Sequence, residues 1–104
     1  MVPTGSNRRR GSGMEERLRN LLLGSESGPK RARIILVLDQ APVNTNQIAD
    51  RLDLNYNTVR YHLQVLREQG IVESGEERYG QRHFLTEQFE HHWDEFERIV
   101  DDLD

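Results

Sequence analysis

The sequence of 104 residues predicts one small, mainly α-helical domain that carries a short β-hairpin. Apolar residues recur at helical spacing in five segments, and two of these, within residues 44–69, are separated by only about three residues. Two β-prone runs follow them, at Ile71-Val72 and at residues 83–85. Two helices joined by a short turn and followed by a hairpin form a winged helix-turn-helix, which is the fold class we expect.

The folded domain is predicted to cover residues 14–104. Residues 1–13 are rich in Gly, Ser and Arg and cannot bury enough surface to order themselves, so we expect a flexible arm or a tail left by cloning. A first helix, Glu15–Leu23, has acidic residues at its start and a leucine stripe. A second helix, Pro29–Asp39, begins with a residue favoured in the first turn. Its apolar residues 34–38 point in nearly all directions, which predicts that this helix is the buried centre.

Capping signals define the next two helices. Asn44 can cap the third helix while Gln47 reaches back to the Asn44 backbone, in the arrangement called a capping box. After a tight turn, Asn55 can cap a fourth helix, Tyr56–Gln69, which Gly70 can close. These two helices form the predicted helix-turn-helix.

The last part of the chain combines a hairpin with a terminal helix. A loop of about seven residues joins the two predicted strands, and Thr86 can cap a last helix from Glu87 to about Leu103. Large apolar residues follow one another at spacings of four and three along this helix: Phe89, Trp93, Phe96, Val100 and Leu103. Such a stripe packs either on the core of its own chain or on a second copy of the chain.

Composition and charge exclude several classes of function. Lys and Arg number 14 and Asp and Glu number 18, so the net charge of −4 argues against a uniformly basic nucleic-acid coat protein but not against a local basic face. The absence of Cys removes disulfides, thiolate metal sites and Cys nucleophiles. The longest apolar run has five residues and no secretory signal opens the sequence, so we expect a soluble, cytoplasmic protein.

The charge is unevenly distributed along the chain. Residues 1–42 carry a net charge of +4, residues 43–86 carry −1 and residues 87–104 carry −7. A polarised chain of this kind usually presents its two ends to different partners. Thirteen of the 14 cations are Arg, which together with abundant carboxylates is typical of salt-loving archaea, although high-GC coding produces the same preference.

The fourth helix has two chemically different sides. With 100° per residue, Val59, Leu63 and Leu66 fall on one side and should face the core. The opposite side carries polar side chains of long reach with one cation among them: Asn57, Arg60, Tyr61 and Gln64. Asn and Gln can pair with adenine and Arg with guanine in a major groove, so this side predicts DNA binding; a plain polar surface helix is the alternative. His62 flanks the core side, where a packing or hydrogen-bonding role is favoured and a phosphate contact is the alternative.

Further cations could contact the DNA backbone. Arg78 and Arg82 lie on the predicted hairpin, where Arg can pair with phosphates or enter a minor groove, although neighbouring glutamates weaken the local field. Lys30, Arg31 and Arg33 lie in the first turns of a helix, where they oppose its dipole. Phosphate contact is one explanation for this conflict and a solvated face is the other. The candidate DNA-binding residues are therefore Tyr56, Asn57, Arg60, Tyr61, Gln64, Arg78, Arg82, Lys30, Arg31 and Arg33.

Catalytic and metal-binding patterns are weak. His91 lies one turn from Glu87 and Glu95, but His91 and His92 point to different faces of a helix, which is a poor start for tetrahedral zinc. The sequence contains no clear nucleophile–base pair or glycine-rich phosphate loop. We therefore expect neither an enzyme nor a cofactor nor a small-molecule ligand.

The stretch NTNQIADRLDLNYNTVRYHLQVLREQGIVES, with the later RYGQRHFLT, resembles the ArsR-like winged-helix transcriptional regulators, particularly archaeal ones. The resemblance covers residues 29–90, and its most specific part is LNYNTVRYHLQVLREQGIV. It implies a dimeric regulator that binds double-stranded DNA, with Tyr56, Asn57, Arg60 and Tyr61 at the positions that read bases.

The same resemblance implies a dimer interface built by the first and last helices. Carried over to this chain, that role falls on Leu18, Leu21, Leu22, Phe89, Trp93, Phe96 and Val100. The alternative is that these residues pack within one chain. A winged helix used for protein–protein assembly is a second functional hypothesis, which the acidic tail favours and the uncharged polar side of the fourth helix does not.

Overall fold

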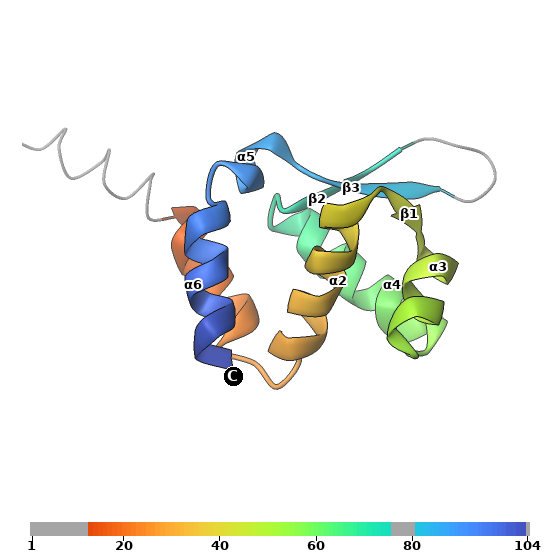
Figure 1. Ribbon diagram of the computed structural model, residues 1–104, viewed down its shortest axis with the longest axis horizontal. Helices are drawn as coiled ribbons and strands as arrows, with labels where there is room; N and C mark the ends of the chain where they lie inside the picture. The colour runs from red at the N-terminus through yellow and green to blue at the C-terminus, as the bar shows by residue number, and fades with distance from the viewer. Residues whose placement is uncertain (1–12, 76–80, 104) are drawn as a thin grey trace, which may run out of the picture.

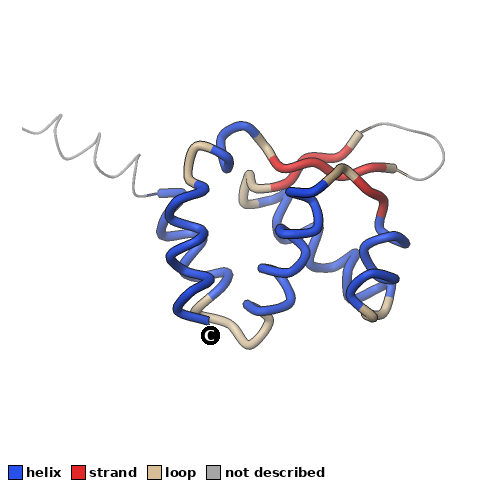
Figure 2. Tube along the Cα trace, in the orientation of Figure 1, coloured by secondary structure: helices blue, strands red, loops and turns tan. Residues whose placement is uncertain are grey.

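The elements follow one another in the predicted order, with one added strand and one interrupted helix. The computed structural model describes residues 13–75 and 81–103. Its helices are the N-terminal helix (13–22), α2 (Gly28–Gln40), α3 (Thr45–Leu52), α4 (Tyr56–Glu68), α5 (Glu87–Glu90) and α6 (Trp93–Leu103), and its strands are β1 (Val43–Asn44), β2 (Val72–Ser74) and β3 (Arg82–Leu85) (Figure 1). The strands lie together on one side of the helices (Figure 2). The mainly helical fold with a small wing is confirmed.

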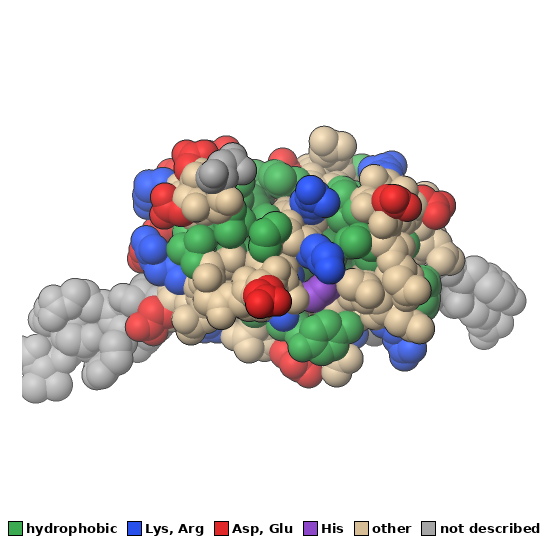
Figure 3. Space-filling view, turned by 90° about the horizontal axis from the view of Figure 1, so that it is seen from below, with side chains coloured by type: hydrophobic (Ala, Val, Ile, Leu, Met, Phe, Trp, Pro, Cys, Tyr) green, Lys and Arg blue, Asp and Glu red, His purple; other side chains and the backbone are tan. Residues whose placement is uncertain are grey.

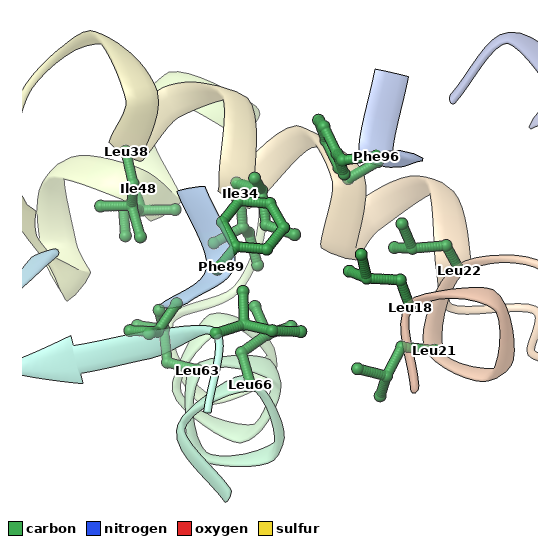
Figure 4. Packing of buried hydrophobic residues seen from close by; sticks show 14 of the residues in the cluster. Leu18, Leu21, Leu22, Ile34, Leu38, Ile48, Leu63, Leu66, Phe89 and Phe96 are labelled. Atoms are coloured by element: carbon green, nitrogen blue, oxygen red, sulfur yellow. The ribbon is translucent and has the colours of Figure 1, made fainter. Parts of the chain in front are cut away.

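Helix α2 lies in the middle of the molecule. The N-terminal helix and α6 lie to one side of it, and α3 and α4 lie to the other (Figure 1). Figure 4 shows Ile34 and Phe89 at the centre of the core, with Leu38, Ile48 and Leu63 toward one end and Leu18, Leu22 and Phe96 toward the other. One continuous core therefore joins both ends of the molecule. Among the described residues, no helix has the length and apolar character needed to cross a bilayer.

The expectation that α2 is buried on nearly all sides is wrong at Leu36. This side chain is 41% exposed, whereas Ile34 and Ile35 are fully buried. Leu36 lines a groove between α2 and α6, opposite Trp93 and Val100. An unbroken apolar run predicts burial but does not tell which side of the helix its neighbours leave open.

The helix-turn-helix forms as the capping signals predict. The Asn44 side chain accepts a hydrogen bond from the Gln47 backbone at 2.9 Å, and the Gln47 side chain accepts one from the Asn44 backbone at 2.9 Å. In the turn, Asp53 adopts a left-handed φ of 57°, a conformation that Asp tolerates better than most residues. Asn55 Oδ1 then accepts from the backbone N–H of Asn57 at 2.8 Å and caps α4. Both helix ends at the turn are thus fixed by local hydrogen bonds.

The sheet has three strands in the order β1-β3-β2, and both pairings are antiparallel. His83 in β3 is paired with Val43 on one side and Ser74 on the other. Strand β1 was not predicted, because two residues carry no alternating pattern. Since β1 leads directly into α3, it ties the wing to the start of the helix-turn-helix.

The prediction of a single last helix is wrong, because the helix is interrupted between Glu90 and Trp93. Thr86 caps the first part as expected, with its hydroxyl oxygen accepting from the Phe89 backbone at 3.0 Å. The backbone N–H of His92 then donates to the Phe89 carbonyl at 2.8 Å. This bond spans three residues instead of four, so the chain turns more tightly at this point than in an α-helix.

Two residues of α6 face the core, Phe96 and Ile99, and both are at most 1% exposed. Phe96 belongs to the predicted stripe and Ile99 does not, whereas Val100, which the resemblance assigns to a dimer interface, is only partly buried.

We expect Ile99→Ala to lower the free energy of unfolding by about 2–5 kcal/mol, because it leaves a cavity in the core. Val100→Ala should lower it by less than about 1 kcal/mol, because that side chain is only partly enclosed. Urea unfolding of both variants measures the difference. Equal losses, or a larger loss for Val100→Ala, would contradict an α6 that turns Ile99 inward.

Candidate nucleic-acid interface

Helix α4 buries one side and exposes the other. Val59, Leu63 and Leu66 are at most 1% exposed, as the periodicity predicts. The residues of the predicted reading side are all exposed: Tyr56, Asn57, Arg60, Tyr61 and Gln64. Tyr56 is 46% and Tyr61 57% exposed, which is unusual for large aromatic side chains in a small domain. The exposed side of α4 is therefore rich in side chains that can donate, accept and stack.

The charge of this side is low and changes along the helix. From Tyr56 to Gln64 the one exposed charged side chain is Arg60. Near the C-terminal end, Gln64 Nε2 donates to Glu68 Oε2 at 3.4 Å. The first two turns of α4 are thus the part that an anionic partner can approach without meeting a carboxylate on the same helix.

Arg31, predicted to contact DNA, is instead buried, with 7% of its surface exposed. Its Nη1 donates to the Leu21 carbonyl at 3.1 Å and its Nε donates to His62 Nδ1 at 3.3 Å. The DNA contact expected for Arg31 is therefore wrong, because position 31 shares the inner side of α2 with Ile34 and Ile35. The guanidinium instead joins the N-terminal helix, α2 and α4.

Lys30 and Arg33 remain on the surface of α2. Seen from below, Lys and Arg side chains gather near a His in the middle of the molecule (Figure 3). Lys30 lies close enough to His62 to influence its titration. Lys30 is therefore available beside α4, as a phosphate-contacting role requires, whereas Arg33 lines the groove between α2 and α6.

His62 has the structural role that its position predicts. It is 3% exposed, and its ring meets that of Tyr61 edge to face at a centroid distance of 5.3 Å. Burial lowers the pKa of His62 below its ordinary value, and the charges of Arg31 and Lys30 lower it further. The neutral ring can then accept the Arg31 hydrogen bond through Nδ1. This bond links the inner side of α2 to a residue next to the exposed Tyr61.

A second buried histidine connects the wing with both helices of the helix-turn-helix. His83 in β3 is 2% exposed, with Nδ1 2.7 Å from Ser74 Oγ and Nε2 3.0 Å from Thr45 Oγ1. Arg67 of α4 donates to the same Ser74 oxygen at 3.3 Å. Burial, and then the charge of Arg67, lower the pKa of His83. Sequence reasoning treated His83 only as a β-prone residue, and a polar residue inside an apolar strand was the available signal.

Of the two arginines predicted for the wing, the structure describes Arg82. Arg82 is exposed at the start of β3. Arg78 lies outside the described residues. Next to the wing, a hollow of about 180 Å³ is lined only by uncharged polar side chains from the starts of α3 and α4 and from the wing: Asn44, Thr45, Asn46, Tyr56 and Gln81. Among the residues that the structure describes, which leave out 76–80 of the wing, no acidic side chain lines this hollow.

Most residues predicted for a dimer interface are used within one chain. Leu18, Leu22, Phe89 and Phe96 are at most 1% exposed, and Leu21 is 9% exposed. These five belong to the chain's own core and offer almost no surface to a second copy, which corrects the assignment. The remaining two, Trp93 and Val100, line the groove between α2 and α6.

Metal-binding geometry is not assembled in the described part of the chain. No group of three or more His, Asp or Glu residues there could hold a metal ion. His92 Nδ1 lies 3.2 Å from Glu95 Oε1, a pair on neighbouring turns with no third ligand.

Sequence comparison supports the central part of this architecture. A protein family described as a helix-turn-helix domain matches residues 27–75, from the start of α2 to the end of β2. No curated protein matches the chain significantly.

Similar solved structures extend the comparison to the wing and the outer helices. The homodimeric winged helix-turn-helix DNA-binding domain of a possible ArsR-family transcriptional regulator from Mycobacterium bovis has a TM-score of 0.67 at 20% identity, covering 98% of this chain and 87% of that chain. The fold is a winged helix-turn-helix. The transcriptional repressor BigR from Xylella fastidiosa has a TM-score of 0.64 at 24% identity, covering 81% of this chain and 78% of the BigR chain. ZitR from Lactococcus lactis, solved in complex with DNA, has a TM-score of 0.58 at 20% identity; 69% of this chain matches 51% of the ZitR chain.

We expect the free energy of unfolding to fall as the pH drops below the ordinary His pKa of 6.5. The unfolded chain takes up protons there, whereas folded His62 and His83 resist protonation, so the stability that is complete above this pH is lost on acidification. Urea unfolding between pH 8 and pH 5 measures the effect. His62→Gln and His83→Gln should each flatten the profile, while His91→Gln, at an exposed position, should leave it unchanged. An unaltered profile in both of the first two variants would contradict this origin.

Proposed function

We propose that the chain is a DNA-binding transcriptional regulator of the ArsR-like type that acts in the cytoplasm without catalytic activity. The observation that carries the proposal is the exposed side of α4, where uncharged polar and aromatic groups surround Arg60. In a winged helix-turn-helix, the second helix of the pair enters the major groove and its first turns meet the base edges. Asn57 and Gln64 can pair with adenine and Arg60 with guanine, and Tyr56 and Tyr61 supply further contacts.

Phosphate contacts would orient this helix in the groove. Lys30 is exposed on α2 and Arg82 is exposed on the wing, with Arg78 as a further wing candidate, whereas Arg33 lines the groove between α2 and α6. We assign the wing, residues 71–86, to the DNA backbone or the minor groove. The described side chains that line the hollow between the helix starts and the wing are all uncharged, which supports this orientation, because a carboxylate there would repel phosphate.

We infer that the regulator acts as a homodimer and that the groove between α2 and α6 is its interface. The groove is about 390 Å³ in volume where Leu36, Trp93 and Val100 meet, and Figure 3 shows hydrophobic side chains gathered where these two helices lie. Arg33 lines the part of the groove near the start of α2, and Glu97 and Asp101 line the part along α6. A two-fold axis would bring the basic rim of each copy to the acidic rim of the other.

Support for the dimer also comes from the Mycobacterium bovis domain, which is described as homodimeric. Two copies would present their α4 helices to successive major grooves about 34 Å apart on a palindromic site.

Arg60→Ala should cost about 1–3 kcal/mol of affinity for the preferred site and relax the base preference at one position. The site is first selected from a randomised DNA library, and the affinity is then measured by fluorescence anisotropy. Arg98→Ala removes an exposed cation from α6 and serves as the control, with affinity unchanged. Unchanged affinity and preference for Arg60→Ala would exclude Arg60 from base reading.

Protein–protein assembly is the second candidate function, favoured by the net charge of −4 and the acidic α6. Titration against mixed DNA at several salt concentrations separates the two. A steep loss of binding with salt indicates phosphate contacts, whereas no binding even at low salt would leave assembly as the better account.

Leu36→Glu should convert the dimer into a monomer, because it introduces a charge into the apolar groove. Leu23→Glu is the matched control: Leu23 is 39% exposed, close to the 41% of Leu36, but does not line the groove. Sedimentation equilibrium reports the oligomeric state of both variants. If Leu23→Glu gives a monomer and Leu36→Glu does not, the interface lies next to the N-terminal helix and not in the groove.

A further inference from the structure

His83 is the point at which the wing meets both helices of the helix-turn-helix through side-chain hydrogen bonds. One ring nitrogen contacts Ser74 of β2 and the other contacts Thr45, the first residue of α3. Arg67 of α4 reaches the same Ser74 hydroxyl. A single buried ring therefore lies in a chain of hydrogen bonds that includes four elements of the fold.

The hydrogen-bonding capacity of the His83 ring is fully used. A neutral imidazole has one N–H donor and one acceptor nitrogen, and a hydroxyl can both donate and accept. If Ser74 donates to Nδ1, then Nε2–H donates to Thr45; if Nδ1–H donates to Ser74, then Thr45 donates to Nε2. In both arrangements Ser74 can still accept from Arg67, so the ring is held from both sides.

The backbone of the sheet does not need this cluster. Strand β3 pairs with β1 and β2 through the main chain, and the core around Ile71 and Val72 is apolar. An apolar side chain could fill the same volume without the cost of burying polar groups. The hydrogen bonds fix the orientation of the His83 ring. They thereby fix the position of the wing relative to α3 and α4.

We propose that His83 is a positioning residue that holds the wing at a fixed angle to α4, so that one duplex can contact both. This proposal rests on the proposed DNA-binding function. It assigns His83 no contact with DNA, since the side chain is buried. Its effect on binding passes through the wing, whereas base preference stays with the exposed side of α4.

His83→Phe and His83→Gln test the proposal as a pair. Phe keeps a planar ring of similar size but removes both hydrogen bonds, whereas the Gln amide can supply one donor and one acceptor. Hydrogen exchange in the free protein should rise about tenfold for the β2 and β3 amides in His83→Phe and stay unchanged for the buried turns of α4. His83→Gln should restore most of the protection. His91→Phe, at an exposed position, is the control and should change neither region.

DNA binding gives the second readout. For His83→Phe we expect an affinity several-fold lower for all DNA sequences alike, with an unchanged base preference. The salt slope, which is the slope of the logarithm of the affinity against the logarithm of the salt concentration, should fall by about one for each lost phosphate contact. The double variant Thr45→Val, Ser74→Ala removes the ring's two partners and should reproduce this pattern. It decides the question if His83→Phe does not fold.

The outcomes separate this proposal from the one on which it rests. Wild-type protein that binds no DNA would overturn the proposed function, whatever the exchange rates show. Wild-type protein that binds DNA, with wing exchange and salt slope unchanged in the folded variants, would overturn only the role of His83. Loss of base preference with the wing still protected would also overturn it, because the effect would then pass through α4.

Discussion

The burial of one side of α4 is the constraint on which the surface of this protein depends. Val59, Leu63 and Leu66 are enclosed almost completely, and α3 packs against the same helix. A close-packed interior does not allow such a helix to rotate about its axis. A rotation by the angle between two successive residues would bring polar side chains into the core. The direction in which the Asn57 and Arg60 side chains point is therefore set by the packing of the buried side of α4. The core alone thus produces an exposed polar side with a fixed orientation.

Buried polar groups add a second level of order to this arrangement. In the described part of the chain, no buried side-chain nitrogen or oxygen lacks a hydrogen bond. Arg31 and His62 join α2 to α4, and His83 joins the wing to α3, in each case without a carboxylate. Neutral histidines suit these positions because they accept or donate without adding charge to a site that already holds a cation. The apolar core brings the elements together, and these bonds fix their relative angles.

Local signals predicted the helix-turn-helix closely, because caps and turns depend on residues next to one another. The Asn44 capping box and the Asn55 cap formed as expected. Features that depend on distant neighbours were missed: the exposure of Leu36 follows from which sides of α2 are covered, and the burial of Arg31 from the carbonyl it finds on the N-terminal helix. The interruption between α5 and α6 was missed because no Gly or Pro marks it. The exposed side of α4 was predictable; the bonds that support it were not.

The distribution of charge is compatible with the proposed binding of DNA by a chain of net negative charge. Helix α6, which carries five of the 18 acidic residues, lies at the opposite end of the molecule from α3 (Figure 1). At physiological salt, charges further apart than about 8 Å are largely screened, so α6 has little effect at the surface of α4. The nearer carboxylates of Asp50, Asp53 and Glu68 still limit the local attraction. Binding that depends more on hydrogen bonds than on electrostatic attraction to phosphate is weak for a single copy of the chain. A second copy bound to the same duplex would compensate for this weakness.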